Sequence, residues 1–236
     1  MKRTDIVFAL CLILLFLPFF LFNEVFSFYE SFNKEHIMIM SFIKFAILAT
    51  TGELLGLRLK KGVYFEKGFG VIPRAIVWGF LGLAIQMAFV IFSTGIPIFI
   101  SKTLGFAFAA DYLDKEKIQA MDFGLKLLVS FSISASMNII FAPIMMTFHK
   151  ITDTHIINNG GTLVGFFKPI QFGNIMSEMN WRVQWDFVFK KTIPFFWIPA
   201  HTITFMLPPE YRVLFAAILG IALGVIMAIA SQKGQK

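Results

Sequence analysis

The chain has 236 residues, of which 57% are hydrophobic and 15% charged; soluble domains carry about 25% charged residues, so the composition excludes an ordinary soluble domain. The formal net charge of +7 does not indicate a nucleic-acid-binding protein, because the basic residues lie between apolar segments and form no run with interleaved aromatic residues. The single cysteine, Cys11, excludes an intrachain disulfide and a site built on paired thiolates.

Six apolar segments are long enough to cross a bilayer, whose hydrocarbon core of roughly 30 Å takes about 20 residues of helix. In chain order they are residues 6–22, 37–57, 75–100, 127–148, 192–207 and 213–231. Lipid offers no partner for an unpaired backbone group, so spanning segments of this kind are helices. We therefore predict an all-α fold, a polytopic transmembrane bundle of about six spans. Pro97 in the third segment predicts a tilt or a break there.

The first segment has the basic start of a signal peptide, but no small-x-small cleavage signal follows it, and we expect it to be retained as a membrane helix. Because no targeting presequence is distinct from this segment, a bacterial inner membrane is favoured over an organellar one.

The positions of Lys and Arg predict the orientation. If every segment crosses once, most basic residues fall on the side of the amino terminus. The other side receives only Lys34, Lys102, Lys115, Lys117 and Arg212. Lys and Arg accumulate in cytoplasmic loops, so both termini are predicted to be cytoplasmic.

Residues 149–191 form the largest stretch outside the apolar segments, and we expect a cytoplasmic loop there. Its sequence Asn158–Asn159–Gly160–Gly161 predicts a turn. Aromatic and charged residues alternate over residues 174–191, which favours an amphipathic helix on the membrane surface. The same pattern also fits the start of the fifth span with an aromatic belt, and both interpretations stay open.

Polar side chains inside the spans are costly unless they face protein or water. Gln86, Asn138 and His201 lie near the middle of three different spans and, with Glu53 and Lys126, are the candidate lining of a hydrophilic passage. The alternative is structural. The first three would then bond between helices, Glu53 would pair with the nearby Arg58, Lys60 or Lys61, and Lys126 would pair with Asp122 four residues earlier.

No catalytic motif is present. His149 and His155 lie six residues apart with Asp153 between them, which is a weak metal-site pattern. The sequence has no phosphate-binding glycine loop and no nucleophile elbow. We predict that the protein is not an enzyme and that it holds neither a metal nor another cofactor.

The last segment carries a stripe of small residues spaced by four, which lets a second helix approach closely. The stripe consists of Ala216, Gly220, Gly224 and Ala228. The partner helix belongs either to this chain or to a second copy, so a homo-oligomer through Gly220 and Gly224 is one of two expectations. The lipid bilayer is the other expected partner.

The carboxyl-terminal region resembles the closing signature of the Mpv/PMP family, small integral proteins of peroxisomal and mitochondrial inner membranes with bacterial relatives. The matching residues are Trp197, Pro199, Phe205, Pro208, Tyr211 and Arg212. By this resemblance residues 37–236 form the family core, and residues 1–36 are an amino-terminal transmembrane extension.

The signature also has a physical interpretation. Pro208 and Pro209 end the fifth helix, and Pro209 suits the first turn of the sixth. Arg212 opposes the dipole of that turn and needs a partner, such as Glu210, another acid or a lipid phosphate.

Two functions follow as hypotheses. The resemblance implies a channel or pore for small solutes or ions, since members of the family are considered channel-forming. The alternative is a non-conducting structural or interaction protein, which would use the small-residue stripe and the basic segment near residues 181–191.

Overall fold

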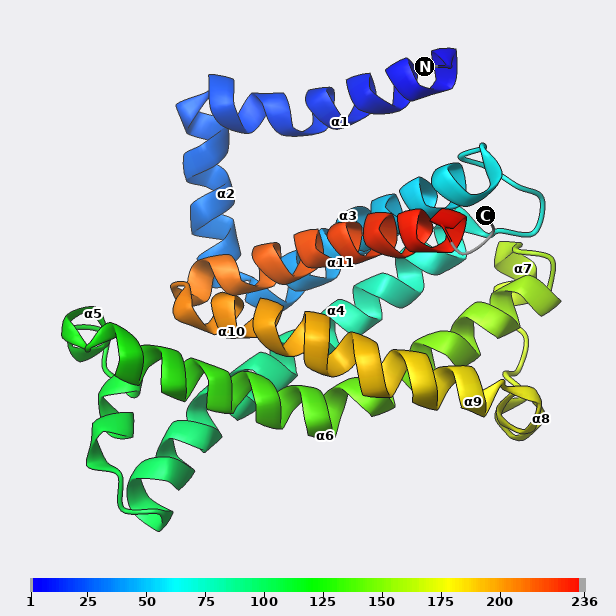
Figure 1. Ribbon diagram of the computed structural model, residues 1–236. Helices are drawn as coiled ribbons and strands as arrows, with labels where there is room; N and C mark the ends of the chain where they lie inside the picture. The colour runs from blue at the N-terminus through cyan, green and yellow to red at the C-terminus, as the bar shows by residue number, and fades with distance from the viewer. Residues whose placement is uncertain (1, 234–236) are drawn as a thin grey trace.

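Helices are the only regular secondary structure over the residues that the structure describes, which confirms the predicted all-α class (Figure 1). The computed structural model describes the backbone of residues 2–233 and the side chains of residues 2–222. The elements are α1 (Arg3–Leu21), α2 (Asn23–Glu35), α3 (Ile37–Lys61), α4 (Val71–Ile98), η1 (Phe99–Thr103), η2 (Ala107–Leu113), α5 (Lys117–Ala120), α6 (Phe123–Asn158), α7 (Leu163–Phe166), α8 (Phe172–Glu178), α9 (Trp181–Val183), η3 (Gln184–Trp197), α10 (Ile198–Met206) and α11 (Pro209–Lys233).

Four helical segments of the described chain are long and apolar enough to cross a membrane. They are Arg3–Leu21, Ile37–Lys61, Val71–Thr103 and Phe123–Asn158. Each contains most of one of the first four predicted spans. Many large apolar side chains on the surface, such as Phe20 at 84% exposure and Phe195 at 80%, have no protein contact that covers them. The chain is therefore a membrane protein with several apolar helices.

At Pro97, where a tilt or a break was predicted, the helical run is not interrupted but changes its type. Helix α4 continues past the proline, and its hydrogen bonding changes to the wider π type in η1 before the helix ends at Thr103. Proline removes one backbone donor from the ladder, and a π turn is one way in which a helix accommodates this loss.

The region 149–191 also differs from the prediction. Helix α6 extends to Asn158, so the first ten residues of the expected loop are helical. The turn after it forms as predicted, with positive φ at Gly160 and Gly161. Residues 174–191 are not one surface helix, because α8 ends at Glu178 and a new helix begins at Trp181, capped by the Asn180 side chain at 3.0 Å from the Val183 nitrogen. The second interpretation, the start of the fifth helical segment, describes this region better.

The bundle is built around α3, which packs on α4 and α11, while α6 packs on α4 and α10. The long helices run in alternating directions (Figure 1). The carboxyl ends of α3, α6 and α11 therefore lie at one end of the bundle, here called the Lys60 end. The junction between α10 and α11 lies at the opposite end, here called the Arg212 end. The amino-terminal end of α1 also lies at the Lys60 end.

Glycines let α3 approach both neighbours. A Cβ on Gly82 of α4 would lie 2.7 Å from the Phe45 Cβ, and a Cβ on Gly52 of α3 would lie 2.9 Å from the Ile221 Cα. Gly220 faces Ala49 of the same chain. The described part of the small-residue stripe, Ala216 and Gly220, thus packs on α3. The other two residues of the stripe, Gly224 and Ala228, lie outside the residues whose side-chain packing the structure describes.

Arg212 binds main-chain carbonyls at the end of α10. Its Nε donates to the Leu207 oxygen at 3.0 Å, and its Nη2 donates to the Phe205 oxygen at 3.3 Å and to the Tyr112 hydroxyl at 3.1 Å. The Tyr112 hydroxyl donates to the same Phe205 oxygen at 2.5 Å. The last carbonyls of a helix lack intrahelical partners and carry negative partial charge, so a guanidinium stabilises them. The hydrogen-bond partners of Arg212 are therefore main-chain carbonyls and Tyr112, and Glu210 is not among them within the described residues. The prolines act as predicted, with α10 ending at Met206 and α11 beginning at Pro209.

Helix α1 stands apart from the bundle (Figure 1), and none of its residues is buried. It is held at its start by the pair of Asp5 with Arg58, 2.6 Å between Oδ1 and Nε, and by stacking of Phe8 on Tyr64. Its apolar side chains are left for lipid, which suits the predicted amino-terminal extension.

Candidate functional site

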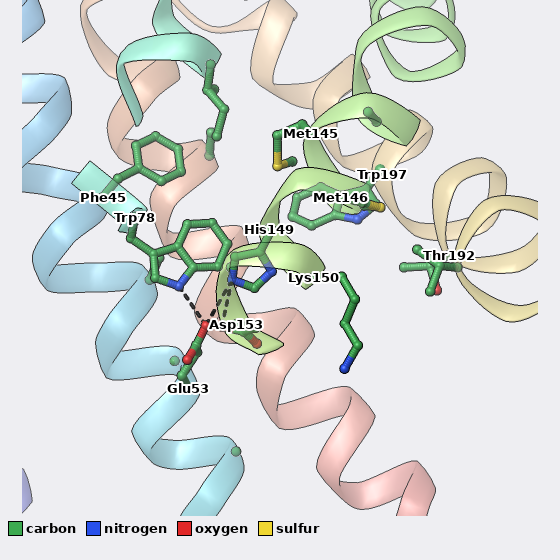
Figure 2. A pocket seen from close by; sticks show the side chains of 18 of the residues that line it. Phe45, Glu53, Trp78, Met145, Met146, His149, Lys150, Asp153, Thr192 and Trp197 are labelled. Atoms are coloured by element: carbon green, nitrogen blue, oxygen red, sulfur yellow. Dashed lines mark hydrogen bonds and ion pairs between the residues drawn. The ribbon is translucent and has the colours of Figure 1, made fainter. Parts of the chain in front are cut away.

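A cavity of about 520 Å³ lies inside the bundle, within the range of ligand sites. Helices α3, α4 and α11 form one wall, and α6, η3 and α10 form the other. The walls are mainly apolar, and the large apolar residues that line them include Phe45, Leu57, Trp78, Ile85, Met137, Phe141, Met145, Met146, Val188 and Trp197 (Figure 2).

The cavity is elongated and reaches the surface at the Lys60 end. Its lining runs along α6 from Met137 to Asp153, which is about 24 Å at 1.5 Å per residue. At the Lys60 end the lining includes two exposed lysines, Lys60 and Lys150. Toward the Arg212 end it stops at a packed core, in which the rings of Phe89 and Phe205 meet edge to face at 5.1 Å. The cavity is therefore accessible from one end of the bundle and closed toward the other.

An ion-pair network around the buried Arg74 forms part of the wall near the Lys60 end. Arg74 Nη1 lies 2.5 Å from Glu53 Oε2 and 2.6 Å from Asp153 Oδ1, so one guanidinium joins carboxylates from α3 and α6. Arg74 Nε also donates to the Phe69 oxygen at 2.7 Å. The arginine is 5% exposed. Burial at this level is costly for a charge, and the two acids offset that cost.

The second oxygen of Glu53 holds two aromatic donors in place. Trp78 Nε1 donates to Oε1 at 2.7 Å, and His149 Nε2 lies 3.2 Å from the same oxygen (Figure 2). The rings of Trp78 and His149 lie 4.4 Å apart. Glu53 thus joins α3 to α4 and α6 at one point. Two acids and one arginine leave the network with one negative charge when His149 is neutral, and a proton on His149 balances it.

Three side chains in this network could in principle bind a metal ion, but their carboxylates already bind Arg74. Ligand atoms of Glu53, His149 and Asp153 lie within 4.8 Å of one another. Arg74 occupies an oxygen of each carboxylate, so a cation would have to displace the guanidinium. His155, the other histidine of the weak sequence pattern, is turned away from His149 and lies 3.1 Å from the Phe166 oxygen through Nε2. The residues fit an ion-pair network better than a metal centre.

Deeper in the cavity a second polar cluster joins α6 to α10. Asn138 Oδ1 lies 3.2 Å from His201 Nδ1, while the Asn138 Nδ2 donates to the Ser134 oxygen at 2.8 Å. The His201 ring packs against Trp197, with 5.1 Å between ring centres. Nδ1 is engaged, so His201 Nε2 is the ring nitrogen left without a protein hydrogen bond among the described residues.

Of the five residues predicted to line a passage, three line the cavity: Glu53, Asn138 and His201. Gln86 is buried in α4 but is not part of the lining. Lys126 lies in the second turn of α6 at the Arg212 end, away from the lining. Asp122 does not pair with it, because the Asp122 carboxylate caps α6 at the nitrogens of Gly124 and Leu125. Depth along a span was predictable from the sequence, whereas the direction of each side chain depends on helix rotation.

The predicted pairing of Glu53 with Arg58, Lys60 or Lys61 is wrong. Glu53 pairs with Arg74, while Arg58 pairs with Asp5 and Lys61 with Glu66. Three members of the network were not predicted as such: Arg74, His149 and Asp153. A signal existed, because Arg74 and Trp78 on α4 and His149 and Asp153 on α6 are each four residues apart and therefore share a helix face.

The family-signature residues lie in different parts of the structure. Trp197 lines the cavity, whereas Phe205 and Arg212 belong to the closed Arg212 end. Pro199 and Tyr211 are exposed. Pro208 lies between α10 and α11. The signature therefore describes mainly how α10 is joined to α11.

The chain matches no protein-family model, no curated protein and no solved structure in comparisons with known proteins.

Proposed function

We propose that this protein is a multi-pass membrane protein that lets small solutes or ions cross along the cavity in its bundle. One observation carries the proposal: the cavity of about 520 Å³ follows the helix axes between apolar walls and contains polar groups at two depths. A polar lining inside an otherwise apolar bundle is what a solute pathway requires. The resemblance of the carboxyl-terminal segment to the Mpv/PMP family points in the same direction.

The proposal includes the topology. Six crossings with both termini in the cytoplasm put the Lys60 end on the cytoplasmic side, where basic residues accumulate. The helical run from Trp181 to Met206 and helix α11 would supply the fifth and sixth crossings. A bacterial inner membrane is the proposed location. In this orientation the cavity is open to the cytoplasm and closed toward the other face, so passage requires the core around Phe89 and Phe205 to open.

Solute efflux from liposomes tests the proposal. Purified protein in phosphatidylcholine liposomes should release a trapped small solute faster than protein-free liposomes. His201→Leu and Asn138→Leu should each slow release about fivefold, because each removes a polar group worth about 1 kcal/mol to a passing solute. Gln86→Leu is the matched control, a buried polar residue outside the lining, and should leave release unchanged.

The outcomes separate the two hypotheses. Liposomes that stay sealed with well-folded protein would favour the non-conducting structural or interaction protein. Release that is equal in wild type, His201→Leu and Asn138→Leu would place the pathway elsewhere. Circular dichroism of each variant shows whether the fold is retained.

A further inference from the structure

The acids of the cavity wall are not available to a solute. Glu53 and Asp153 are the acidic residues of the lining, and both bind Arg74, at 2.5 and 2.6 Å. Arg74 itself is buried behind them at 5% exposure. A cation that enters the cavity would have to compete with a guanidinium that is already placed between the two carboxylates.

The basic residues of the lining are free, in contrast. Lys60 on α3 and Lys150 on α6 both belong to the lining and are exposed at the Lys60 end. Among the described residues neither lysine has an ion pair, whereas the nearby Lys61 pairs with Glu66 at 2.7 Å. The opening of the cavity thus carries two lysines that form no ion pair with a carboxylate among the described residues.

An uncharged hydrogen-bonding group lies at the same end. Gln184, in the first turn of η3, lines the cavity at 7% exposure. Its side-chain amide has no protein hydrogen bond within the described part of the chain. The amide lines the cavity, so a ligand there would provide a hydrogen-bond partner. Together, Lys60, Lys150 and Gln184 bring donors from three elements to the opening.

Beyond this polar opening the walls of the cavity are mainly apolar, apart from the cluster of Asn138 and His201. The apolar lining on α6 includes Met137, Phe141, Met145 and Met146. The apolar lining on α3 includes Phe45, Ala49 and Leu57. Flexible methionine side chains adapt to apolar ligands of different shapes. A small inorganic ion would leave this surface without a partner, whereas an alkyl or aromatic body would cover it.

We propose that the cavity takes organic anions, with the acidic head group at Lys60, Lys150 and Gln184 and the apolar body between α3 and α6. This assignment rests on the proposed function and names its solute class. The shared chemistry is a singly charged acidic group on an apolar chain, taken up from water or from the bilayer.

Entry of two permanently charged probes into liposomes tests this assignment. Hexanesulfonate and hexyltrimethylammonium have the same chain length and opposite charge, and neither crosses a bare bilayer by losing its charge. Wild-type protein should take up the anion about 25-fold faster than the cation, since two lysines near the head group each contribute about fivefold to this ratio in a partly aqueous site.

The double variant Lys60→Gln with Lys150→Gln should bring the two rates close to each other. The matched control, Lys67→Gln with Lys168→Gln, removes the same charge from two exposed lysines outside the lining. This control should keep the preference of the wild type. Gln184→Leu should slow anion uptake and leave cation uptake unchanged. Slower anion uptake in vesicles that contain phosphatidylglycerol would identify the bilayer as the source, and uptake independent of lipid would identify water.

Failure of this assignment differs from failure of the proposed function. Equal uptake of both probes, or faster cation uptake, overturns the anion assignment while the flux itself supports the pathway. Absence of all uptake contradicts the pathway. In that case, equilibrium dialysis of radiolabelled hexanesulfonate against the protein in phosphatidylcholine nanodiscs decides: binding that the lysine double variant loses supports the assignment, and absence of binding overturns it.

Discussion

Arg74 is the residue on which the inner part of the bundle depends most. It lies on α4, yet its side chain satisfies a carboxylate of α3 and a carboxylate of α6. Glu53 then orients Trp78 and His149. Charged groups at this depth are stabilising only as a complete set, because each one alone would be a buried, unpaired charge.

Removal of Arg74 should therefore destabilise the protein strongly. We expect Arg74→Ala to lower the free energy of unfolding by about 3–5 kcal/mol, since Glu53 and Asp153 stay partly buried without their partner. Lys61→Ala, which breaks the exposed pair with Glu66, should cost less than about 1 kcal/mol. Thermal unfolding in detergent, followed by circular dichroism, measures the difference between the two variants.

A rescue distinguishes charge from packing. Glu53→Gln and Asp153→Asn, added together to Arg74→Ala, remove the uncompensated charges and should restore much of the lost stability. Equal unfolding temperatures for Arg74→Ala and Lys61→Ala would show that the network is not important to the fold.

The sequence located Glu53 correctly but not its partner. Lys60 follows Glu53 on the same helix face, yet two turns later and about 10 Å away along the axis. Arg74 reaches Glu53 because α4 runs back along α3 after a short connection. Local spacing predicts interactions within a helix, whereas this pair depends on how two helices face each other.

At the scale of elements, close approach of α3 to α11 closes one side of the cavity. Gly52 allows this approach, because a side chain there would meet the backbone of α11 at Ile221. The small-residue stripe was predictable from its spacing of four. Its partner was not, since many helices present small residues and only the packed structure selects one of them.

Gly52→Ala should separate the two helices and lower the free energy of unfolding by about 1–3 kcal/mol, because the added methyl group would lie 2.9 Å from the Ile221 Cα. Gly95→Ala is the matched control in α4, where an added Cβ meets nothing within 4 Å. The control should leave stability unchanged or raise it slightly, as alanine is the better helix former. Unfolding temperatures in one detergent compare the pair. A loss of stability that is equal in both variants would contradict the packing.

The π-helical element η3 is the part of the fold that sequence patterns predicted least well. The apolar segment suggested a helix from residue 192, whereas the helical run begins at Trp181 and keeps π bonding from Gln184 to Trp197. Pro194 lies inside this stretch and removes a backbone donor. Gln184, Val188, Thr192 and Trp197 nevertheless line one cavity, so the irregular helix places a continuous stripe toward it.

At the scale of the whole molecule, composition and segment length were sufficient to predict that the protein lies in lipid and that its fold is all-α. Lipid forces helices, and a helix that spans it needs a minimum length, so both follow from the sequence. The cavity does not follow in this way. It exists because α3 and α6 both pack on α4 without filling the space between them, and that depends on the rotation of each helix about its axis.

The central claim is that water reaches the cavity from the cytoplasmic end of the bundle. Modification of single cysteines in a Cys11→Ser background tests it most directly. Met146→Cys lies in the lining, and Ile144→Cys, two residues away, lies on the lipid-facing surface at 69% exposure of the native isoleucine. A membrane-impermeant, charged thiol reagent reacts with the thiolate, which forms in water and not in lipid.

We predict that the reagent modifies Met146→Cys when it is added to the cytoplasmic side in inside-out vesicles, and leaves Ile144→Cys largely unmodified. Modification of Met146→Cys only from the opposite side, or at the rate of Ile144→Cys, would contradict the account.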